Sequence, residues 1–495
     1  MKILRTFLCL MLCTMLLTGC AAPPPPPASP TPPPAAPGPE APIGDAALRQ
    51  EAIIPLHLPS RDGQTLLTVF ETLNLPMDQH PAQSILTALL THPGNSRVQP
   101  LGGQVSLTLY GANPVEISGS VCTVNLSAGA LQLSTQALYT AALAITATLC
   151  ELADIAHVNL LIAGTPVAMD VGGHLPLGTL SAPALTELPA LWEQLSSRRT
   201  PVGELPAHTP LTTAATLYFP LTDGSGIVAE PRRISFPGQH PQQQVTALLE
   251  ALSDGAEMLE DVCNLPNLNA LLLFPPEITD LESGGRRATL HFTADISARL
   301  SAAGCDPTAA FAAIVTTLTT FVPSLQQVCI LVGDGAMTSL YSDPLGSLLF
   351  PGGLMARTTF AHALMSQSVI YVPREGSLAA RMLSLPYRNS ASPRALLLAM
   401  AQASVLPEGL TDADILGLCL QDGTLLVNFS ARYGQLIQAS DTDQRLMAYA
   451  MVNTLCRQLN IRRVRFYFGG EALEALGSAT VWNGEFLYNP ALISP

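Results

Sequence analysis

Side chains with the chemistry for catalysis are few and widely spaced in this 495-residue sequence. The closest carboxylate pairs are Asp412 with Asp414 and Asp441 with Asp443, and each pair precedes an apolar segment as helix caps or turn residues do. The nine histidines form no HExxH motif and no pair at helical spacing, so no metal site is predicted. A GxSxG motif is missing, and a phosphate-binding loop is excluded because Lys2 is the only lysine. These patterns predict a protein that is not an enzyme and holds no cofactor.

The cysteines divide between the amino terminus and the rest of the chain. Three of the ten lie within the first 20 residues, which leaves an odd number beyond them and argues against a complete disulfide framework. Cys150 and Cys456 each follow a Thr-Leu pair and are expected to be buried helix residues. Bridges from Cys122 to Cys150 and from Cys419 to Cys456 are the alternative.

The amino terminus has the layout of a secretory signal. Two basic residues precede an apolar run from Phe7 to Leu17, which is too short to be a good membrane-spanning helix. The run ends in Leu-Thr-Gly-Cys, which resembles the lipobox of bacterial lipoproteins. The resemblance implies that residues 1–19 are removed and that Cys20 carries a lipid anchor with palmitate or a related acyl chain.

Composition limits the partners and the number of domains. Residues 20–51 are rich in proline, which predicts an extended stalk that packs no core. The formal net charge of -14 disfavours nucleic acid as a partner. A chain of this length exceeds a single core, so several domains or repeats are expected.

One order of signals occurs three times beyond the stalk. An apolar strand ends in proline before an acidic-Gly turn, at Leu58-Pro59 with Asp62-Gly63, Phe219-Pro220 with Asp223-Gly224, and Val372-Pro373 with Glu375-Gly376. A second strand leads to a helix, whose start suits proline because the missing N–H would be unpaired there. These helix starts are His80-Pro81, His240-Pro241 and Ser392-Pro393.

The second half of each copy is equally regular. An alternating segment, typical of a half-buried strand, occupies 124–128, 290–294 and 427–431. A longer helix follows, and its apolar residues lie at helical spacing before a Thr-Leu pair at Thr148-Leu149, Thr317-Leu318 and Thr454-Leu455. A short apolar strand closes each copy at 158–162, 328–332 and 464–468.

This order predicts an α+β fold made of three tandem small domains, each a sheet of about five strands with two helices. The predicted boundaries are 1–19 for the signal peptide, 20–51 for the lipidated Cys20 and linker, 52–171, 213–338 and 366–478 for the three repeats, 172–212 and 339–365 for connectors, and 479–495 for a tail. The apolar run Leu348–Met355 is interrupted by Pro-Gly-Gly, which favours a covering flap over a docking segment.

The second copy resembles the sporulation and spore germination (GerMN) domain family. The matching residues are Leu217-Tyr218-Phe219-Pro220, Arg232-Arg233-Ile234, Thr317-Leu318-Thr319 and the strand 328–332. The first and third copies lack the paired arginines and resemble the family less. The resemblance implies extracytoplasmic, often lipid-anchored proteins of spore-forming and related Gram-positive bacteria, without known catalytic residues. It also implies a fold similar to ring-building modules of sporulation complexes.

The preferred interpretation is a scaffold or adaptor on the outer face of the cytoplasmic membrane that binds envelope proteins or copies of itself, in sporulation or germination. Candidate partner-binding residues are Arg232, Arg233, Arg463 and Arg465, of which the last two alternate onto one face of the closing strand. A solvated edge is the simpler role for that face, and an acidic partner is the alternative. A peptidoglycan- or solute-binding module is the main rival function, and a cell-wall hydrolase comes third.

The lipid anchor gives the first testable prediction. Cys20→Ala removes the thiol that would be acylated, so the variant should accumulate as an unprocessed precursor or be released from the membrane. Cell fractionation with intact-mass measurement checks this. A variant that is cleaved normally and stays membrane-bound would contradict the lipoprotein assignment.

Overall fold

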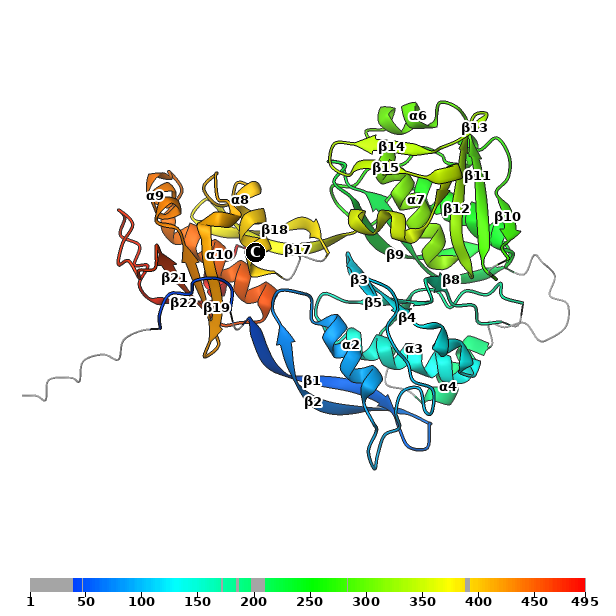
Figure 1. Cartoon of the computed structure of the whole chain (residues 1–495), viewed down its shortest axis with the longest axis horizontal. Helices are drawn as coiled ribbons and strands as arrows, with labels where there is room; N and C mark the ends of the chain where they lie inside the picture. The colour runs from blue at the N-terminus through cyan, green and yellow to red at the C-terminus, as the bar shows by residue number, and fades with distance from the viewer. Residues whose placement is uncertain are drawn as a thin grey trace, which may run out of the picture. The chain divides into compact units, whose positions relative to one another are not determined.

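The computed structural model describes residues 39–46, 48–170, 172–183, 187–196, 210–282, 284–387 and 392–494 (Figure 1). Residues 41–495 form one compact unit, and all helices and strands named below belong to it. The predicted signal peptide, Cys20 and most of the stalk lie outside the described residues. Within the described part of the chain, no helix has the length and apolarity needed to cross a membrane.

The fold is α+β, and the predicted element order occurs three times. Repeat 1 contains β1 (Arg49–Pro59), β2 (Leu66–Pro76), α2 (Ala82–Thr91), β3 (Val115–Ser118), β4 (Val121–Leu126), η1 (Ala128–Gln132), α3 (Thr135–Leu149), β5 (His157–Ile162) and β6 (Thr165–Pro166). Repeat 2 contains β8 (Leu211–Pro220), β9 (Ile227–Phe236), α5 (Pro241–Ser253), η2 (Asn269–Leu271), β10 (Glu277–Asp280), β11 (Arg286–Phe292), α6 (Ile296–Ala302), α7 (Pro307–Phe321), β12 (Leu325–Val332) and β13 (Gly335–Ala336). Repeat 3 contains β17 (Met365–Arg374), β18 (Ser377–Pro386), α8 (Pro393–Gln402), η5 (Asp412–Asp414), β19 (Ile415–Gln421), β20 (Thr424–Phe429), α9 (Ala431–Ala439), α10 (Gln444–Leu459) and β21 (Arg463–Phe468).

The five predicted strands of each repeat divide between two sheets. The first two strands form a separate antiparallel hairpin, β1–β2, β8–β9 or β17–β18. The next two pair antiparallel, and the long helix then crosses over to a closing strand that runs parallel to its neighbour, as β4 does with β5. This division was not predicted, because hydrophobic alternation marks strands but not which strands pair.

A threonine hydroxyl joins the hairpin to the long helix in every repeat. The backbone N–H of His57 donates to Oγ1 of Thr148 at 2.9 Å, and that of Tyr218 donates to Thr317 at 2.9 Å. Tyr371 donates in the same way to Thr454 at 3.0 Å. These acceptors are the threonines of the three Thr-Leu pairs, and all are buried. The recurring Thr-Leu pair therefore supplies an acceptor for one edge N–H and a core leucine beside it.

The proline that ends each first strand fits the same geometry. In an antiparallel pair, alternate residues direct both backbone groups away from the partner strand. His57 does so, and so does Pro59 two residues later, which has no N–H to leave unpaired. The same two-residue step separates Tyr218 from Pro220 and Tyr371 from Pro373.

Each repeat has its own hydrophobic core. The predicted helical stripe is buried throughout, at Ala142, Ile145 and Leu149, Phe311, Ile314 and Leu318, and Ala448, Met451 and Leu455. The cores are not confined to their repeats, because Val121 of repeat 1 joins the core of repeat 2 and Met77 joins that of repeat 3. The alternating segments at 124–128, 290–294 and 427–431 were predicted to be half-buried strands. This prediction holds for β11 but is wrong for β4 and β20, which are buried on both faces.

The segments predicted as connectors are packed onto the repeats. The first contributes β7 (Leu180–Ser181), which pairs with β5, and α4 (Leu188–Ser196). The second contributes β14 (Ser339–Ser342), β15 (Gly346–Leu349), η3 (Pro351–Gly353), β16 (Leu354–Met355) and η4 (Arg357–Ala363). Phe350 is fully buried in the core of repeat 2, and β16 pairs with β12. The apolar run 348–355 is therefore the expected cover of repeat 2.

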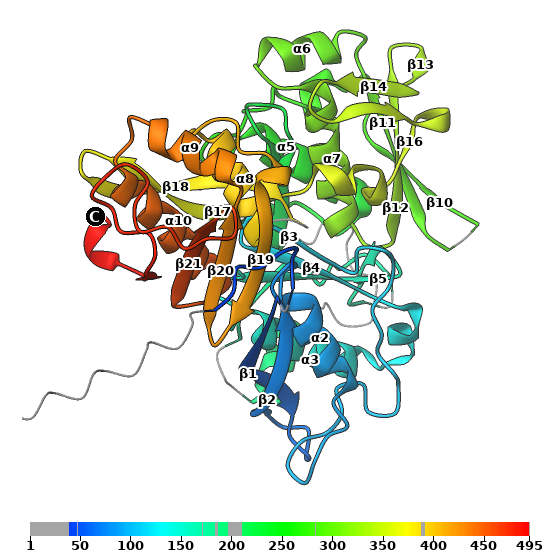
Figure 2. The ribbon, with the colours of Figure 1, turned by 60° about the vertical axis from the view of Figure 1, so that its left-hand side comes forward.

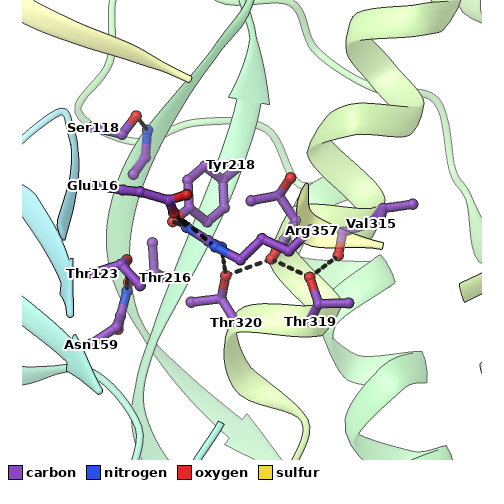
Figure 3. A network of polar contacts seen from close by, with 12 residues as sticks. Glu116, Ser118, Thr123, Asn159, Thr216, Tyr218, Val315, Thr319, Thr320 and Arg357 are labelled. Atoms are coloured by element: carbon purple, nitrogen blue, oxygen red, sulfur yellow. Dashed lines mark hydrogen bonds and ion pairs between the residues drawn. The ribbon is translucent and has the colours of Figure 1, made fainter. Parts of the chain in front are cut away.

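A buried ion pair locks repeat 1, repeat 2 and the second connector together (Figure 3). Nε of Arg357 in η4 donates to Glu116 of β3 at 2.9 Å, and its other nitrogens reach Thr320 of α7 and the Tyr218 hydroxyl. Burial opposes the charge of Arg357, but Glu116 and Tyr218 raise the pKa of this guanidinium overall. Breaking such a pair leaves an uncompensated buried charge and typically costs about 3–5 kcal/mol.

A second buried polar cluster lies beside the ion pair. The side-chain amide of Asn159 in β5 donates to Thr216 of β8 at 3.0 Å, and the Thr179 hydroxyl donates to the Asn159 carbonyl at 2.8 Å. The cluster lies where the β8–β9 hairpin of repeat 2 covers the outer face of the repeat 1 sheet. Because of this cover, β4 and β5 are buried on both faces.

The threonine bond can be tested in repeat 2. Thr317→Val keeps the shape but removes the acceptor, leaving the buried N–H of Tyr218 unpaired, so the free energy of unfolding should fall by about 1–3 kcal/mol. Thr316→Val is the matched control, because the buried Thr316 hydroxyl has no hydrogen-bond partner among the residues that the structure describes. The free energy of unfolding of Thr316→Val should change by no more than about 0.5 kcal/mol, or should increase. Denaturant unfolding followed by circular dichroism measures both. Equal losses in the two variants would show that the hydroxyl of Thr317 is not the cause.

Candidate partner-binding site

A cleft of about 770 Å³ lies between repeat 1 and repeat 3. Repeat 1 lines it with the first half of β1, the end of β2 and the turn after α3, and repeat 3 lines it with the start of β17 and the end of α10. The Gln50 side chain reaches across to the Asn460 carbonyl at 3.3 Å. In Figures 1 and 2 one end of the β1–β2 hairpin adjoins repeat 3. Segments about 400 residues apart in the sequence therefore form one site.

Two unpaired strand edges line this cleft. Because His57 directs its N–H away from β2, Ile53 does the same at the even spacing along β1. In β17, Tyr371 faces away from β18, the Val369 carbonyl accepts from Gln458, and Gln367 is the next outward residue. No hydrogen bond joins the N–H of Ile53 or Gln367 to another residue that the structure describes. Both edges thus retain backbone groups that an extended segment could pair with.

The side chains of the cleft are mixed in polarity. Ile53 and Met382 are large apolar residues that stay 70% and 46% exposed. The acidic residues Glu151 and Asp154 both come from repeat 1, while repeat 3 contributes Arg457.

Histidines pair with both acidic residues. His80 bonds Asp154 at 2.8 Å, and His57 bonds Glu151 at 3.0 Å. Burial raises the pKa of the Asp154 carboxyl, but the hydrogen bond from His80 outweighs it, so the net shift of this pKa is downward. His80 also contacts the start of α2, where its Nδ1 accepts from the N–H of Ala82 at 3.2 Å. His240 heads α5, is exposed and makes no side-chain cap bond.

The predicted arginines do not form one site. Arg232 is 9% exposed and bound to Glu230 at 2.6 Å and to the Gly255 carbonyl at 2.7 Å, so its guanidinium is already used inside repeat 2. Arg233 is its exposed neighbour on β9. The Glu230 carboxyl is held ionised by the N–H groups of Met258 and Glu257 and by Arg232, which together lower its pKa against the effect of burial.

The closing strand of repeat 3 is not the solvated edge that was expected. The tail strand β22 (Glu485–Leu487) pairs with β21, and the short helix η6 (Pro490–Leu492) follows it. Arg463 binds Glu485 at 3.1 Å and Arg465 donates to the Asn483 carbonyl at 3.2 Å. The acidic partner of Arg463 is therefore Glu485 of the same chain. Alternation places Arg463 and Arg465 on one face, as predicted, with Val464 and Phe466 buried between and beyond them.

Of the four carboxylates that were interpreted as caps or turn residues, Asp414 and Asp443 have a capping role. Asp443 caps α10 by accepting from the N–H groups of Arg445 and Leu446. Asp414 accepts from Thr411, Ser430 and Arg432, and the Arg432 hydrogen bond is the main cause of its strongly lowered pKa. Among the described residues, no group of three or more His, Cys, Asp or Glu could hold a metal ion.

The last residues of the predicted linker 20–51 lie on repeat 3, so the prediction that this linker packs no core is wrong for them. Gly44 and Ala46 donate to the carbonyls of Leu416 and Leu418 on β19, at 2.7 and 2.9 Å. Asp45 binds Arg394 at 2.6 Å. The Asn428 amide donates to the Pro42 carbonyl at 2.9 Å. The chain therefore covers the β19 edge before it enters β1 and the cleft.

Two regions of the chain, 56–168 and 366–474, match the family model for sporulation and spore germination (Germane). These two regions are similar to the sporulation and spore germination family. They coincide with repeats 1 and 3, whereas most of the resemblance seen in the sequence came from repeat 2. Repeat 2 is related to these two Germane repeats by its element order and by the Thr317 hydrogen bond.

Two solved structures are similar to the chain. The tandem GerMN domains of the sporulation protein GerM from Bacillus subtilis share 21% identity at a TM-score of 0.22, over 58% of this chain and 92% of that one. A lipoprotein from Clostridium perfringens shares 17% identity at a TM-score of 0.18, over 27% of this chain and 87% of that one. At these scores neither likeness adds to the Germane assignment. No curated protein matches the chain.

The covered β19 edge can be tested at Gly417. A Cβ at this position would lie 2.6 Å from the carbonyl oxygens of Pro42 and Gly44. Gly417→Ala should therefore displace the segment and speed hydrogen exchange of the Gly44 and Ala46 amides by roughly tenfold or more, a local loss of at least ~1.4 kcal/mol. Gly484→Ala is the control, since nothing lies within 4 Å of its Cβ position. Unchanged exchange in Gly417→Ala would contradict the docking.

Proposed function

We propose that this protein is a lipid-anchored, extracytoplasmic adaptor of a sporulating or germinating cell, and that it binds an extended segment of another envelope protein in the cleft between repeats 1 and 3. The Germane match of these two repeats supports the cellular process. The lipobox resemblance at Cys20 supports the anchor, and the docking of residues 42–46 on β19 would put repeat 3 at the end of the stalk.

The observation that carries the proposal is the pair of unpaired strand edges in one cleft. An extended peptide adds to such an edge through its main chain, and its side chains fill neighbouring pockets. Residues 52–55 of β1 and 366–369 of β17 offer edges on the two walls. A guest strand between them would bury the exposed Ile53 and Met382 side chains.

Repeat 2 provides an internal precedent for this binding mode. There the outward edge of β8 is already occupied, because the N–H of Thr179 in the first connector donates to the Ala214 carbonyl at 2.9 Å. Thr179 also bonds the Thr216 hydroxyl at 2.8 Å. In repeat 2 the outward edge of the first strand thus binds the chain's own connector. In repeats 1 and 3 the same edge is open to the cleft.

The rival functions are less well supported by the cleft. A glycan-binding cleft is expected to carry aromatic side chains, and none of the described residues that line this one is aromatic. A hydrolase needs two carboxylates on opposite sides of its substrate. Here Glu151 and Asp154 both lie on the repeat 1 wall and the lining residues of repeat 3 include no acid.

The test uses a photo-crosslinking residue in the cleft. Full-length chain with p-benzoylphenylalanine in place of Met382 is irradiated in cells during sporulation, and crosslinked peptides are identified by mass spectrometry. We expect a segment of one envelope protein, and we expect Ile53→Pro to reduce its yield several-fold by removing the outward N–H. Ile53→Val keeps that N–H and the apolar side chain, and should crosslink normally.

The outcomes separate the candidates. A partner recovered equally with Ile53→Pro would rule out pairing at the β1 edge. Binding of the purified chain to peptidoglycan, abolished by changes in the cleft, would favour the cell-wall module instead.

A further inference from the structure

Two buried cysteines of repeat 2 face one another. Cys263 and Cys305 are 4% and 2% exposed. The sulfur of Cys263 lies 3.2 Å from the carbonyl oxygen of Gly304, and that of Cys305 lies 3.5 Å from the carbonyl oxygen of Asn264. Each sulfur therefore contacts the residue next to the other cysteine.

The backbone holds both cysteines in fixed positions. The N–H of Cys263 donates to the Pro220 carbonyl at 2.8 Å, at the end of β8. The N–H of Cys305 donates to Leu300 at 3.0 Å, and Cys305 directly precedes Asp306, the N-cap of α7. The pair thus connects the end of the hairpin to the start of the long helix.

The corresponding positions in repeat 1 are not cysteines. The N–H of Gln99 donates to the Pro59 carbonyl at 2.9 Å, as Cys263 does to Pro220. Leu133 directly precedes Ser134, the N-cap of α3, as Cys305 precedes Asp306. The sulfur pair is therefore a feature of repeat 2 and is not required by the fold of a repeat.

We propose that Cys263 and Cys305 form a structural disulfide in the exported protein. The two thiols lose two protons and two electrons, and the acceptor is the disulfide of an extracytoplasmic thiol–disulfide oxidoreductase, which leaves as a dithiol. The export of the chain is part of the function proposed above. The geometry of the pair is independent of it.

Burial determines when the bond forms. It raises the pKa of the Cys305 thiol to about 12 and also raises that of Cys263, so the folded, reduced protein holds little thiolate. Since the thiolate is the attacking species, oxidation should occur while the chain is still folding and be slow afterwards. Once formed, the bond would close residues 263–305 into a loop that contains β10, β11 and α6.

The test is a thiol map of the full-length protein taken from membranes of its own host. Free thiols are blocked with N-ethylmaleimide before digestion, and peptides are compared with and without reduction. We expect a linked peptide pair carrying Cys263 and Cys305, with Cys329 alkylated as a free thiol. Cys263→Ala should leave Cys305 free, whereas Cys329→Ala should leave the link intact.

Alkylation of both Cys263 and Cys305 in chain that carries lipid on Cys20 would overturn the proposal. If Cys20 proves unmodified, the lipid-anchor proposal is wrong, and a second experiment tests the disulfide. In it the full-length chain is reduced, unfolded and refolded in a glutathione redox buffer. Formation of the Cys263–Cys305 link there supports the pairing. Its absence, or a link to another cysteine, overturns it.

Discussion

The hydrogen bond from a strand N–H to a helix threonine fixes how each repeat is built. A two-stranded hairpin is only marginally stable alone, and its outer edge carries backbone groups that must be paired or solvated. Thr148, Thr317 and Thr454 bind that edge to the long helix at one residue. The proline two residues later removes the next donor, so the hairpin is attached at its turn end. The first half of the strand stays open for another segment.

What fills the open half differs between the repeats and determines how they pack. In repeat 2 it is occupied by the first connector and buried against the sheet of repeat 1, beside the Asn159 cluster. The buried Glu116–Arg357 pair then closes the same interface from the second connector. Because a polar interface of this kind tolerates only one arrangement of donors and acceptors, it specifies the packing of repeats 1 and 2. Repeats 1 and 3 are instead left with their open halves on the walls of a shared cleft.

Sequence periodicity predicted the elements well, because each repeat buries the same helical stripe. It located the Thr-Leu pairs but treated the threonine as incidental, since spacing gives no hydrogen bonds. The capping roles of Asp414 and Asp443 followed from their position before apolar segments. The cleft could not be predicted from the sequence, because Gln50 and Asn460 meet only after all three repeats have folded. Arg232 and Arg463 were chosen as exposed charges, yet Glu230 and Glu485 neutralise them within the chain. The interface between repeats 1 and 2 had one signal in the sequence, which was Glu116, a single acidic residue within an apolar strand.

Amide hydrogen exchange resolved to single residues on the mature chain tests the central claim most directly. The claim is that each first strand is held at one N–H by a helix threonine and is open along its first half in repeats 1 and 3. The account predicts slow exchange at His57, Tyr218 and Tyr371, comparable to amides inside the hairpin ladders, and fast exchange at Ile53 and Gln367. Fast exchange at the three threonine-bound amides, or protection of Ile53 and Gln367 in the free protein, would contradict it.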